Sequence, residues 1–278
     1  MDTDNGHLSP YATKPLAHSG GTIMTLIDSH AHLDLSEFNG DRDSVIKRAH
    51  EQGIQRIITI GIGVRECKKA LQISENNPHV YAALGIHPHN AKTLDLAALD
   101  FLEKHGKNQK VVALGEMGLD FFRNLSPRQE QERCFRAQLD LAKSMNLPVI
   151  IHDRDAHDET RAIVREEKGG ETGGVIHCFS GDVALAFAFI DMGFYIGIPG
   201  TVTFKNAPGI QDVATKVPLE SLLIETDCPF LAPAPHRGKR NEPCYVRLVA
   251  EKIAQLKKTS VEEVARSTTR NAEKLFGL

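Results

Sequence analysis

Two histidines separated by a single alanine, His30 and His32, follow the short apolar segment formed by residues 25–27. Side chains two residues apart in an extended strand point to the same face, so both imidazoles would project together if this segment is a strand. Two imidazoles on one face form half of a typical metal site. The pair by itself fits two exposed polar residues equally well, and the rest of the chain must decide between these interpretations.

Similar side chains follow other apolar segments along the chain. They are His, Glu and Asp residues that close short runs of aliphatic residues, namely His87 and His89 in GIHPH, Glu116 and Asp120 in GEMGLD, His152 in IIH, His177 in VIHCFSG and Asp227 in ETDCPFLAP. A charged group left unpaired in an apolar interior costs several kcal/mol, whereas groups that share a cation avoid this cost. We therefore interpret His30 and His32 as metal ligands.

Eight short segments, most of them rich in Val, Ile or Leu and flanked by Gly or Pro, have the composition of buried parallel strands. They are residues 26–30, 56–62, 80–86, 110–116, 148–152, 174–179, 193–198 and 221–227. Eight strands that alternate with helices over about 250 residues predict an α/β protein with a single-domain (β/α)8 TIM barrel. Reacting groups in such barrels lie at the C-terminal ends of the strands, which is where the candidate ligands occur.

Helices are predicted between these strands, in particular at residues 41–53, 126–146, 183–192 and 243–256. Ser126 followed by Pro127 has the pattern of an N-cap with proline at the first helical position. Ser260 with Glu263 is a capping-box candidate for the last helix. A doubly wound open sheet is the alternative fold, but no GxGxxG follows the first strand and no P-loop is present.

Composition narrows the setting in which the protein acts. Residues 1–24 are polar, and we expect a flexible extension before a barrel domain at residues 25–278. The formal net charge of −3 argues against a protein that coats duplex nucleic acid, but not against an enzyme that holds one strand end in a pocket. Five cysteines without a CxxC pair favour the reducing cytoplasm. No apolar stretch approaches the roughly 20 residues of a membrane helix, so we expect no membrane partner.

The number of candidate ligands indicates how many ions the site holds. Even six ligands are too many for one tetrahedral ion with an open position. They fit two divalent ions that share a bridging carboxylate, which could be Glu116 or Asp227. Two ions about 3.5–4 Å apart stabilise the attacking and leaving oxygens of a phosphoryl displacement, and they lower the pKa of water toward about 7, which provides hydroxide at neutral pH.

Six motifs in order resemble the TatD family of metal-dependent nucleases, within the amidohydrolase superfamily. They are DSHAHLD, GIHPH, GEMGLDFF, IIHDRDA, VIHCFSG and ETDCPFLAP, and the resemblance spans residues 25–278. It implies a (β/α)8 barrel with a dinuclear divalent site that binds Mg²⁺, Mn²⁺ or Zn²⁺. It also implies a deoxyribonuclease, often a 3′ to 5′ exonuclease on single-stranded DNA, with RNA as a further substrate.

The resemblance further implies how the ions are held. His30, His32 and Asp227 would bind one ion, and Glu116 would bridge to the other. The second ion would also be bound by the two later histidines, His152 and His177. We expect Asp227 to orient the attacking water and accept its proton, with ligation alone as the alternative role.

A basic loop after the last strand is a candidate for contact with substrate phosphates. It reads APHRGKRNEP and contains Arg237, Lys239 and Arg240. Loops after strands seven and eight of such barrels often bind phosphate, although a solvated run of charges is the alternative. We expect the protein to bind nucleic acid here and to act as a monomer.

Two other loops supply further candidates. GLDFFRN, after the fourth strand, offers Phe121 and Phe122 for base stacking, with packing in the core as the alternative, and Arg123 for a phosphate. His89 could reach the substrate from the third strand, whereas His87 is interpreted as structural. Glu225 and Asp28 are expected to support histidine ligands.

Two alternatives remain for the function. A deaminase or lactonase on the same barrel would also use the HxH pair, two later histidines and a final Asp, but the glutamate at residue 116, in place of a lysine, and the RGKR loop favour a phosphodiester. A non-catalytic protein that binds metal for a partner is the other alternative, and the retention of every ligand argues against it.

Overall fold

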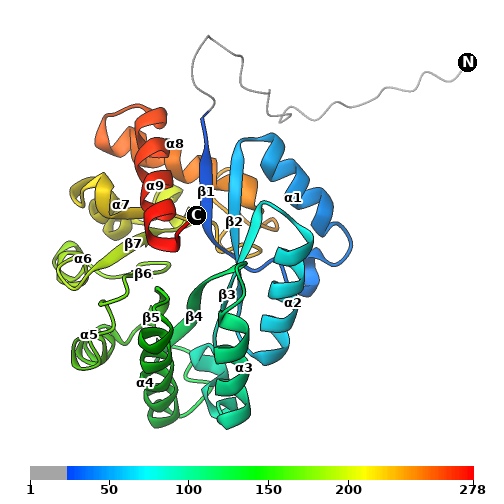
Figure 1. The fold of residues 1–278 in the computed structure, drawn as a ribbon. Coiled ribbons are helices and arrows are strands. Elements are labelled where there is room, and N and C mark those ends of the chain that lie inside the picture. The colour runs from blue at the N-terminus through cyan, green and yellow to red at the C-terminus, as the bar shows by residue number, and fades with distance from the viewer. Residues whose placement is uncertain (1–23) are drawn as a thin grey trace, which may run out of the picture.

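The computed structural model describes residues 24–278, so the predicted extension lies outside the described residues except for Met24. Eight parallel strands pair in sequence order from β1 to β8, which confirms the predicted TIM-like barrel. The helices surround the strands in Figure 1. The strands are β1 (Leu26–Ala31), β2 (Ile54–Gly61), β3 (Val80–Leu84), β4 (Val111–Asp120), β5 (Val149–Arg154), β6 (Gly174–Ile176), β7 (Phe194–Ile198) and β8 (Leu222–Ile224).

The α-helices match the segments predicted between the strands. They are α1 (Arg42–Glu51), α2 (Val64–Asn76), α3 (Leu96–Gly106), α4 (Arg128–Met145), α5 (His157–Glu166), α6 (Val183–Ile190), α7 (Pro208–Lys216), α8 (Val246–Lys257) and α9 (Val261–Phe276). The predicted cap of the last helix is confirmed, because the Glu263 N–H donates to Ser260 Oγ at 3.1 Å. Within residues 24–278, no helix combines the length and apolar composition that crossing a membrane requires.

The start of α4 differs from the prediction. The helix begins at Arg128 and not at Pro127, the predicted first residue. Pro127 takes the N-cap position, and Ser126 does not cap the helix. Instead, the buried Ser126 hydroxyl donates to the His89 carbonyl at 2.8 Å. This contact ties the loop after β4 to the loop after β3, a partnership between distant segments that local sequence patterns cannot reveal.

The barrel is closed by contacts between β1 and the segment that follows β8. The His32 N–H donates to the Cys228 carbonyl at 2.8 Å, and the Asp227 N–H donates to the His30 carbonyl at 2.9 Å. The Asp28 carboxyl group, fully buried beneath these residues, lies 2.9 Å from the Thr226 nitrogen and 2.6 Å from Thr226 Oγ1. Barrel closure therefore places His30, His32 and Asp227 side by side.

We expect Asp28→Ala to lower the free energy of unfolding by about 3 kcal/mol, because it leaves the buried Thr226 groups unpaired and opens a cavity. Burial raises the pKa of Asp28 to about 8, so this carboxyl group is mostly uncharged at neutral pH. The neutral and isosteric variant Asp28→Asn is therefore a suitable control, and it should lose much less stability than Asp28→Ala. Urea unfolding of both variants measures the difference. Equal stability of Asp28→Ala and the unmodified protein would show that this contact does not close the barrel.

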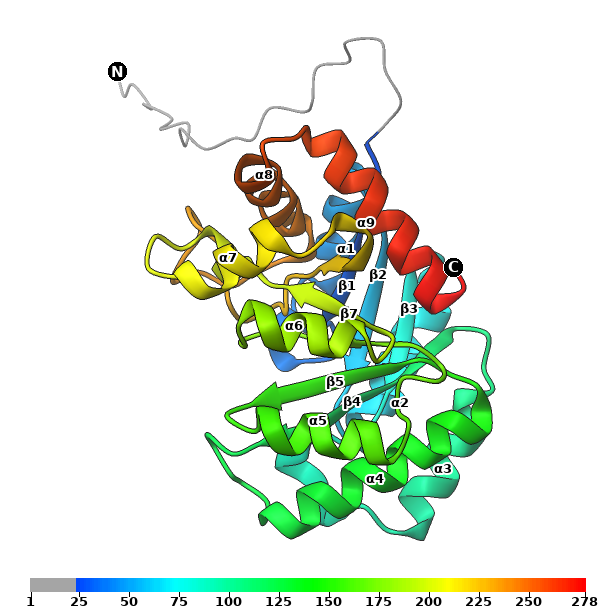
Figure 2. The same ribbon diagram turned by 90° about the vertical axis from the view of Figure 1, so that its left-hand side faces the viewer.

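The inside of the barrel is apolar toward one end only. Ile58, Ile60 and Leu223 form a cluster with Ala272 and Phe276 from the end of α9. In Figure 2 the arrowheads of β5 and β7 point to one side, and the C-terminal end of α9 lies at the other. Because α9 fills the N-terminal end of the barrel, the polar side chains of the strands gather at the C-terminal end.

Candidate metal centre

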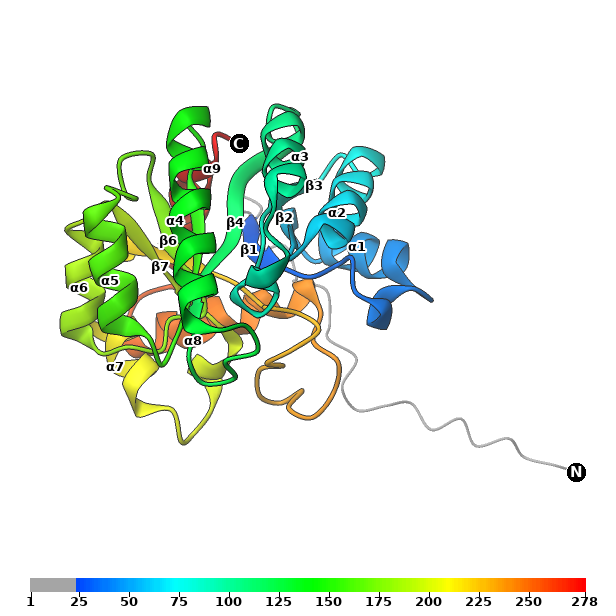
Figure 3. The same cartoon turned by 90° about the horizontal axis from the view of Figure 1, so that it is seen from below.

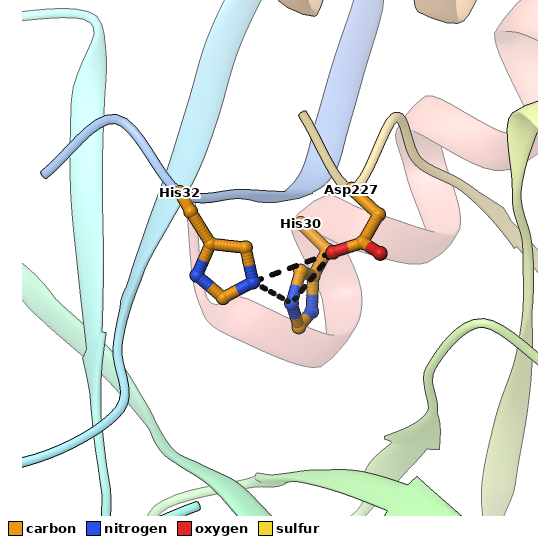
Figure 4. A group of neighbouring side chains, drawn as sticks. All are labelled: His30, His32 and Asp227. Carbon is orange, nitrogen blue, oxygen red and sulfur yellow. Dashed lines mark hydrogen bonds and ion pairs between the residues drawn. The ribbon is translucent and has the colours of Figure 1, made fainter. Parts of the chain in front are cut away.

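His30, His32 and Asp227 form a compact group at the C-terminal end of β1. The two Nε2 atoms of the histidines lie 3.3 Å apart. Asp227 Oδ1 lies 3.3 Å from His32 Nε2 and 3.8 Å from His30 Nε2, as Figure 4 shows. The imidazoles share one face, as the spacing of the motif predicts, and the three ligand atoms converge on one point.

Glu116, which is buried in β4, faces a second group of imidazoles. Its Oε1 atom lies 2.7 Å from His152 Nδ1, 2.9 Å from His177 Nε2 and 3.5 Å from His87 Nε2. Its other oxygen, Oε2, lies 3.5 Å from His30 Nε2, within the first group. One carboxylate oxygen therefore faces each group, which favours Glu116 over Asp227 as the carboxylate between two ions.

Two glycines of the GEMG motif make this position of Glu116 possible. Gly115 and Gly118 have φ values of 142° and 137°, in a region that L side chains rarely adopt. A Cβ atom on Gly118 would also collide with the backbone carbonyl of His152, its partner in β5. Without side chains at these two positions, β4 lies close enough to β5 for Glu116 to meet His152.

Other carboxylates hold the histidines of the second group. Asp120 Oδ2 lies 3.2 Å from His152 Nε2 and 2.9 Å from His89 Nε2. Glu225 Oε1 lies 3.4 Å from His177 Nδ1, which is the supporting position expected for it. Carboxylates behind metal-binding histidines fix the orientation of the ring and raise its basicity.

The expected role of Asp28 needs a correction. Its side chain reaches the backbone N–H of His30 only at 3.4 Å and contacts no imidazole nitrogen within residues 24–278, and its main partner is Thr226. Asp28 therefore supports the site by closing the barrel under it rather than by orienting a histidine ring.

The electrostatics of the two groups favour a bound cation. Burial disfavours charge on His32, but Asp227 outweighs burial and raises the His32 pKa to about 9. Burial also disfavours ionised Glu116, yet the surrounding imidazoles hold its pKa well below the usual range. The site thus keeps carboxylates ionised beside positive charge, and a divalent cation held by these residues would supply that charge in place of protons on the imidazoles.

The donor set fits divalent metal ions. Imidazole and carboxylate donors suit Zn²⁺ and related transition ions. Three sets of side chains each bring their ligand atoms within 4.8 Å of one another, namely His30, His32 and Asp227, then His30, Glu116 and His177, and finally His87, Glu116 and His152. All six candidate ligands of the sequence occur in these sets.

His87, which the sequence interpretation treated as structural, lies among the candidate ligands. It is buried, and its Nε2 atom takes part in the third set, while its Nδ1 atom accepts the His89 N–H at 3.0 Å. The signal was its place in GIHPH, at the end of an apolar run like the other candidates.

The three basic residues of the loop after β8 differ in their contacts and in their exposure. Arg240 donates to Asp41 at 2.6 and 2.8 Å and to Glu242 at 3.1 Å, which favours a structural role over the expected contact with substrate. Arg237 and Lys239 are exposed, and the Arg237 guanidinium lies 4.5 Å from the centre of the Phe204 ring. Of the three, Arg237 and Lys239 therefore remain candidates for phosphate contact.

We expect Arg240→Ala to lower the midpoint of thermal unfolding without changing KM, because it removes the hydrogen bonds between the loop after β8 and Asp41, the residue before α1. Lys239→Ala should leave the midpoint unchanged and raise KM for an oligonucleotide, most clearly at low salt, where charge contacts are strongest. Thermal unfolding and steady-state kinetics of both variants distinguish these roles. The opposite pattern, with KM affected only by Arg240→Ala, would contradict the assignment.

Around the second group, the other substrate candidates lie in the loops after β3 and β4. His89 is bound to Asp120, and Arg123 is exposed. Phe121 is half-buried, whereas Phe122 is exposed. The centre of the Phe122 ring lies 4.0 Å from the guanidinium carbon of Arg154. Arg154 was not expected at the site, although its spacing from His152 in IIHDRDA places both on one face of β5.

Comparisons with known proteins give consistent results. The family model described as TatD related DNase matches residues 27–277. The uncharacterized metal-dependent hydrolase YabD of Bacillus subtilis is 44% identical over 90% of this chain and 98% of its own length. The 3′-5′ ssDNA/RNA exonuclease TatD of Pantoea ananatis is 36% identical over 91% of this chain and 100% of its own length. The crystal structure of the TatD homolog YJJV from Escherichia coli superposes with a TM-score of 0.87 at 34% identity, covering 92% of this chain and 100% of that one.

Proposed function

The chain belongs to the family of TatD-related DNases, and we propose that it is a metal-dependent phosphodiesterase that removes nucleotides from the 3′ ends of single-stranded DNA or RNA. The observation that carries this proposal is the position of Glu116 between two groups of imidazoles, with one oxygen toward each. The relative from Pantoea ananatis, named as a 3′-5′ ssDNA/RNA exonuclease, supports the choice of substrate.

In this proposal, six side chains hold two divalent ions. His30, His32 and Asp227 bind one ion, His152 and His177 bind the other, and Glu116 is shared. Ions held in this way would polarise the phosphoryl group and provide hydroxide at neutral pH.

Asp227 is the proposed proton acceptor. Its Oδ1 atom faces the histidines, while its Oδ2 atom has no hydrogen-bond or ion-pair partner within residues 24–278 and can receive a proton from the attacking water. Burial raises the pKa of Asp227, but the hydrogen bond to His32 and the nearby imidazoles outweigh it and keep the pKa below its usual value. The group is therefore ionised at neutral pH, as a base must be.

Basic side chains at the rim of the site are the proposed contacts for the substrate backbone. Arg237 and Lys239 follow β8, Arg123 lies in the loop after β4 and Arg154 ends β5, and all four are exposed. His89, whose Nε2 atom lies 2.9 Å from Asp120 Oδ2, is a further proposed contact through its other ring nitrogen. Because these charges are confined to the rim, they can hold a strand end although the formal net charge is −3.

The setting of the protein follows from the same observations. All proposed ligands come from one chain, so we propose a monomer. The five cysteines are free thiols, and four of them are buried, which fits the reducing cytoplasm.

Digestion of single-stranded oligonucleotides, labelled at either end, tests the proposal. With Mg²⁺, Mn²⁺ or Zn²⁺ we expect a ladder that shortens from the 3′ end, and no loss of substrate in the presence of a chelator. Amide and lactone substrates in parallel test the deaminase and lactonase alternative. Hydrolysis of a lactone or amide, with intact DNA and RNA under every metal condition, would contradict the proposal.

A further inference from the structure

Exposed aromatic side chains lie beside the metal centre on two sides. Within residues 24–278, five large apolar side chains are exposed, and three of them lie in loops that follow β4 and β8: Phe122 (60% exposed), Leu125 (57%) and Phe230 (49%). In Figure 3 the green loop after β4 and the orange loop after β8 project at the same end of the barrel. Single exposed apolar side chains are ordinary on protein surfaces, so only the surroundings of these rings can indicate a ligand.

Phe230 is held next to the first group of candidate ligands. Its ring centre lies 6.2 Å from that of His32, with the two rings at 65°. The Phe230 N–H donates to the Asp227 carbonyl at 2.9 Å, and its own carbonyl accepts from Asn241 Nδ2 at 2.7 Å. The exposed ring therefore has a fixed backbone position directly beside the candidate base.

Phe122 lies in the loop after β4, which follows the Glu116 and Asp120 side chains of the second group. It comes two residues after Asp120, whose carboxylate contacts His152. The Arg154 guanidinium lies 4.0 Å from the centre of the Phe122 ring. Within residues 24–278, the Arg154 side chain forms no hydrogen bond or ion pair. A ring and a cation with free donors together suit a base and its phosphate.

The two rings lie on opposite sides of the candidate centre. In a ring of eight strands, β4 and β8 are four places apart, so the loops that follow them stand across the barrel mouth from each other. A series of contacts crosses the centre between these loops. The Phe230 ring lies beside His32, which is 3.9 Å from Glu116. Glu116 lies 2.7 Å from His152, which in turn lies 3.2 Å from Asp120. A phosphate held by ions at Glu116 would therefore have one of these loops on either side.

We propose that Phe122 and Phe230 stack on the nucleobases that flank the scissile phosphate. The inference rests on the proposed nuclease function and deepens it, because it explains the choice of strand. A phenyl ring can stack on the face of a base only when that base has left its neighbours in a duplex. The two rings thus select unpaired ends and tolerate any base, since every base offers a π-face.

The test compares a substrate that carries bases at its 3′ end with one that lacks them. The substrates are a thymidine oligonucleotide and one of equal length whose two 3′-terminal nucleotides carry no base. The variants are Phe122→Leu and Phe230→Leu, with Phe122→Tyr and Phe230→Tyr as conservative rescues. Phe187→Leu, an exposed phenylalanine on α6, is the matched control. Thermal unfolding checks that every variant is folded.

Because loss of base–aromatic stacking weakens binding, each Leu variant should raise KM for the thymidine strand roughly tenfold, which corresponds to about 1.4 kcal/mol. The Tyr variants and Phe187→Leu should keep KM within about twofold, and all variants should treat the baseless strand equally. Unchanged KM in Phe122→Leu and Phe230→Leu, with an active unmodified enzyme, would overturn this inference alone. Failure of the unmodified, metal-loaded enzyme to cleave either strand would instead overturn the proposed function.

Discussion

Glu116→Gln should leave the protein folded but deprive it of bound metal and reduce kcat by roughly 10³-fold or more. The glutamate places one oxygen toward each imidazole group, and glutamine offers a single neutral oxygen in the same space. Loss of metal-based charge stabilisation costs several kcal/mol of transition-state energy, and about 1.4 kcal/mol corresponds to a factor of ten in rate. Metal content by mass spectrometry and turnover of a labelled strand measure the two effects.

Asp153→Asn provides the matched control for this substitution. Asp153 is also a buried carboxylate, next to a candidate ligand in sequence, but it lies 2.8 Å from His157 Nδ1 and points away from the centre. We expect this variant to keep its metal and most of its activity. If Glu116→Gln retained two ions per chain and normal turnover, the central role of Glu116 would be refuted.

Asp227→Asn should reduce kcat by about 10²–10⁴-fold and change KM little, because the range is typical for removal of a general base. Asparagine keeps an oxygen near His32 but cannot accept a proton from water. The variant must be assayed with saturating Mn²⁺, so that weaker metal binding does not limit the rate. Single-turnover cleavage of a labelled strand separates the chemical step from product release.

The outcome distinguishes the two roles considered for Asp227. A slow chemical step in fully loaded protein indicates a base, whereas activity restored completely by excess metal indicates ligation alone. The second result would leave the candidate metal centre intact and require another proton acceptor.

Much of the fold follows from the sequence because the strands are buried on both faces. Buried parallel strands appear as short aliphatic runs, and polar residues that end several such runs must share one rim. Glu116 and His152, 36 positions apart, can therefore be placed together from the sequence pattern alone. The family resemblance added the division of the ligands between two ions.

Contacts made by loops were less predictable, since they depend on partners that no local pattern identifies. Arg240 was expected to meet the substrate, yet its partner Asp41 lies 199 positions away in the chain. Phe230 could not be distinguished from a core residue, because phenylalanines fill cores more often than they face a ligand. His87 was interpreted as structural although it forms an HxH pair with His89, because that spacing alone does not show that its Nε2 atom lies 3.5 Å from Glu116 Oε1.

Anomalous diffraction from crystals soaked in Mn²⁺ tests the central claim most directly. The account predicts two peaks on either side of Glu116, one beside His30, His32 and Asp227 and the other beside His152 and His177. Absence of density at Glu116, or manganese bound only elsewhere on the protein, would contradict it.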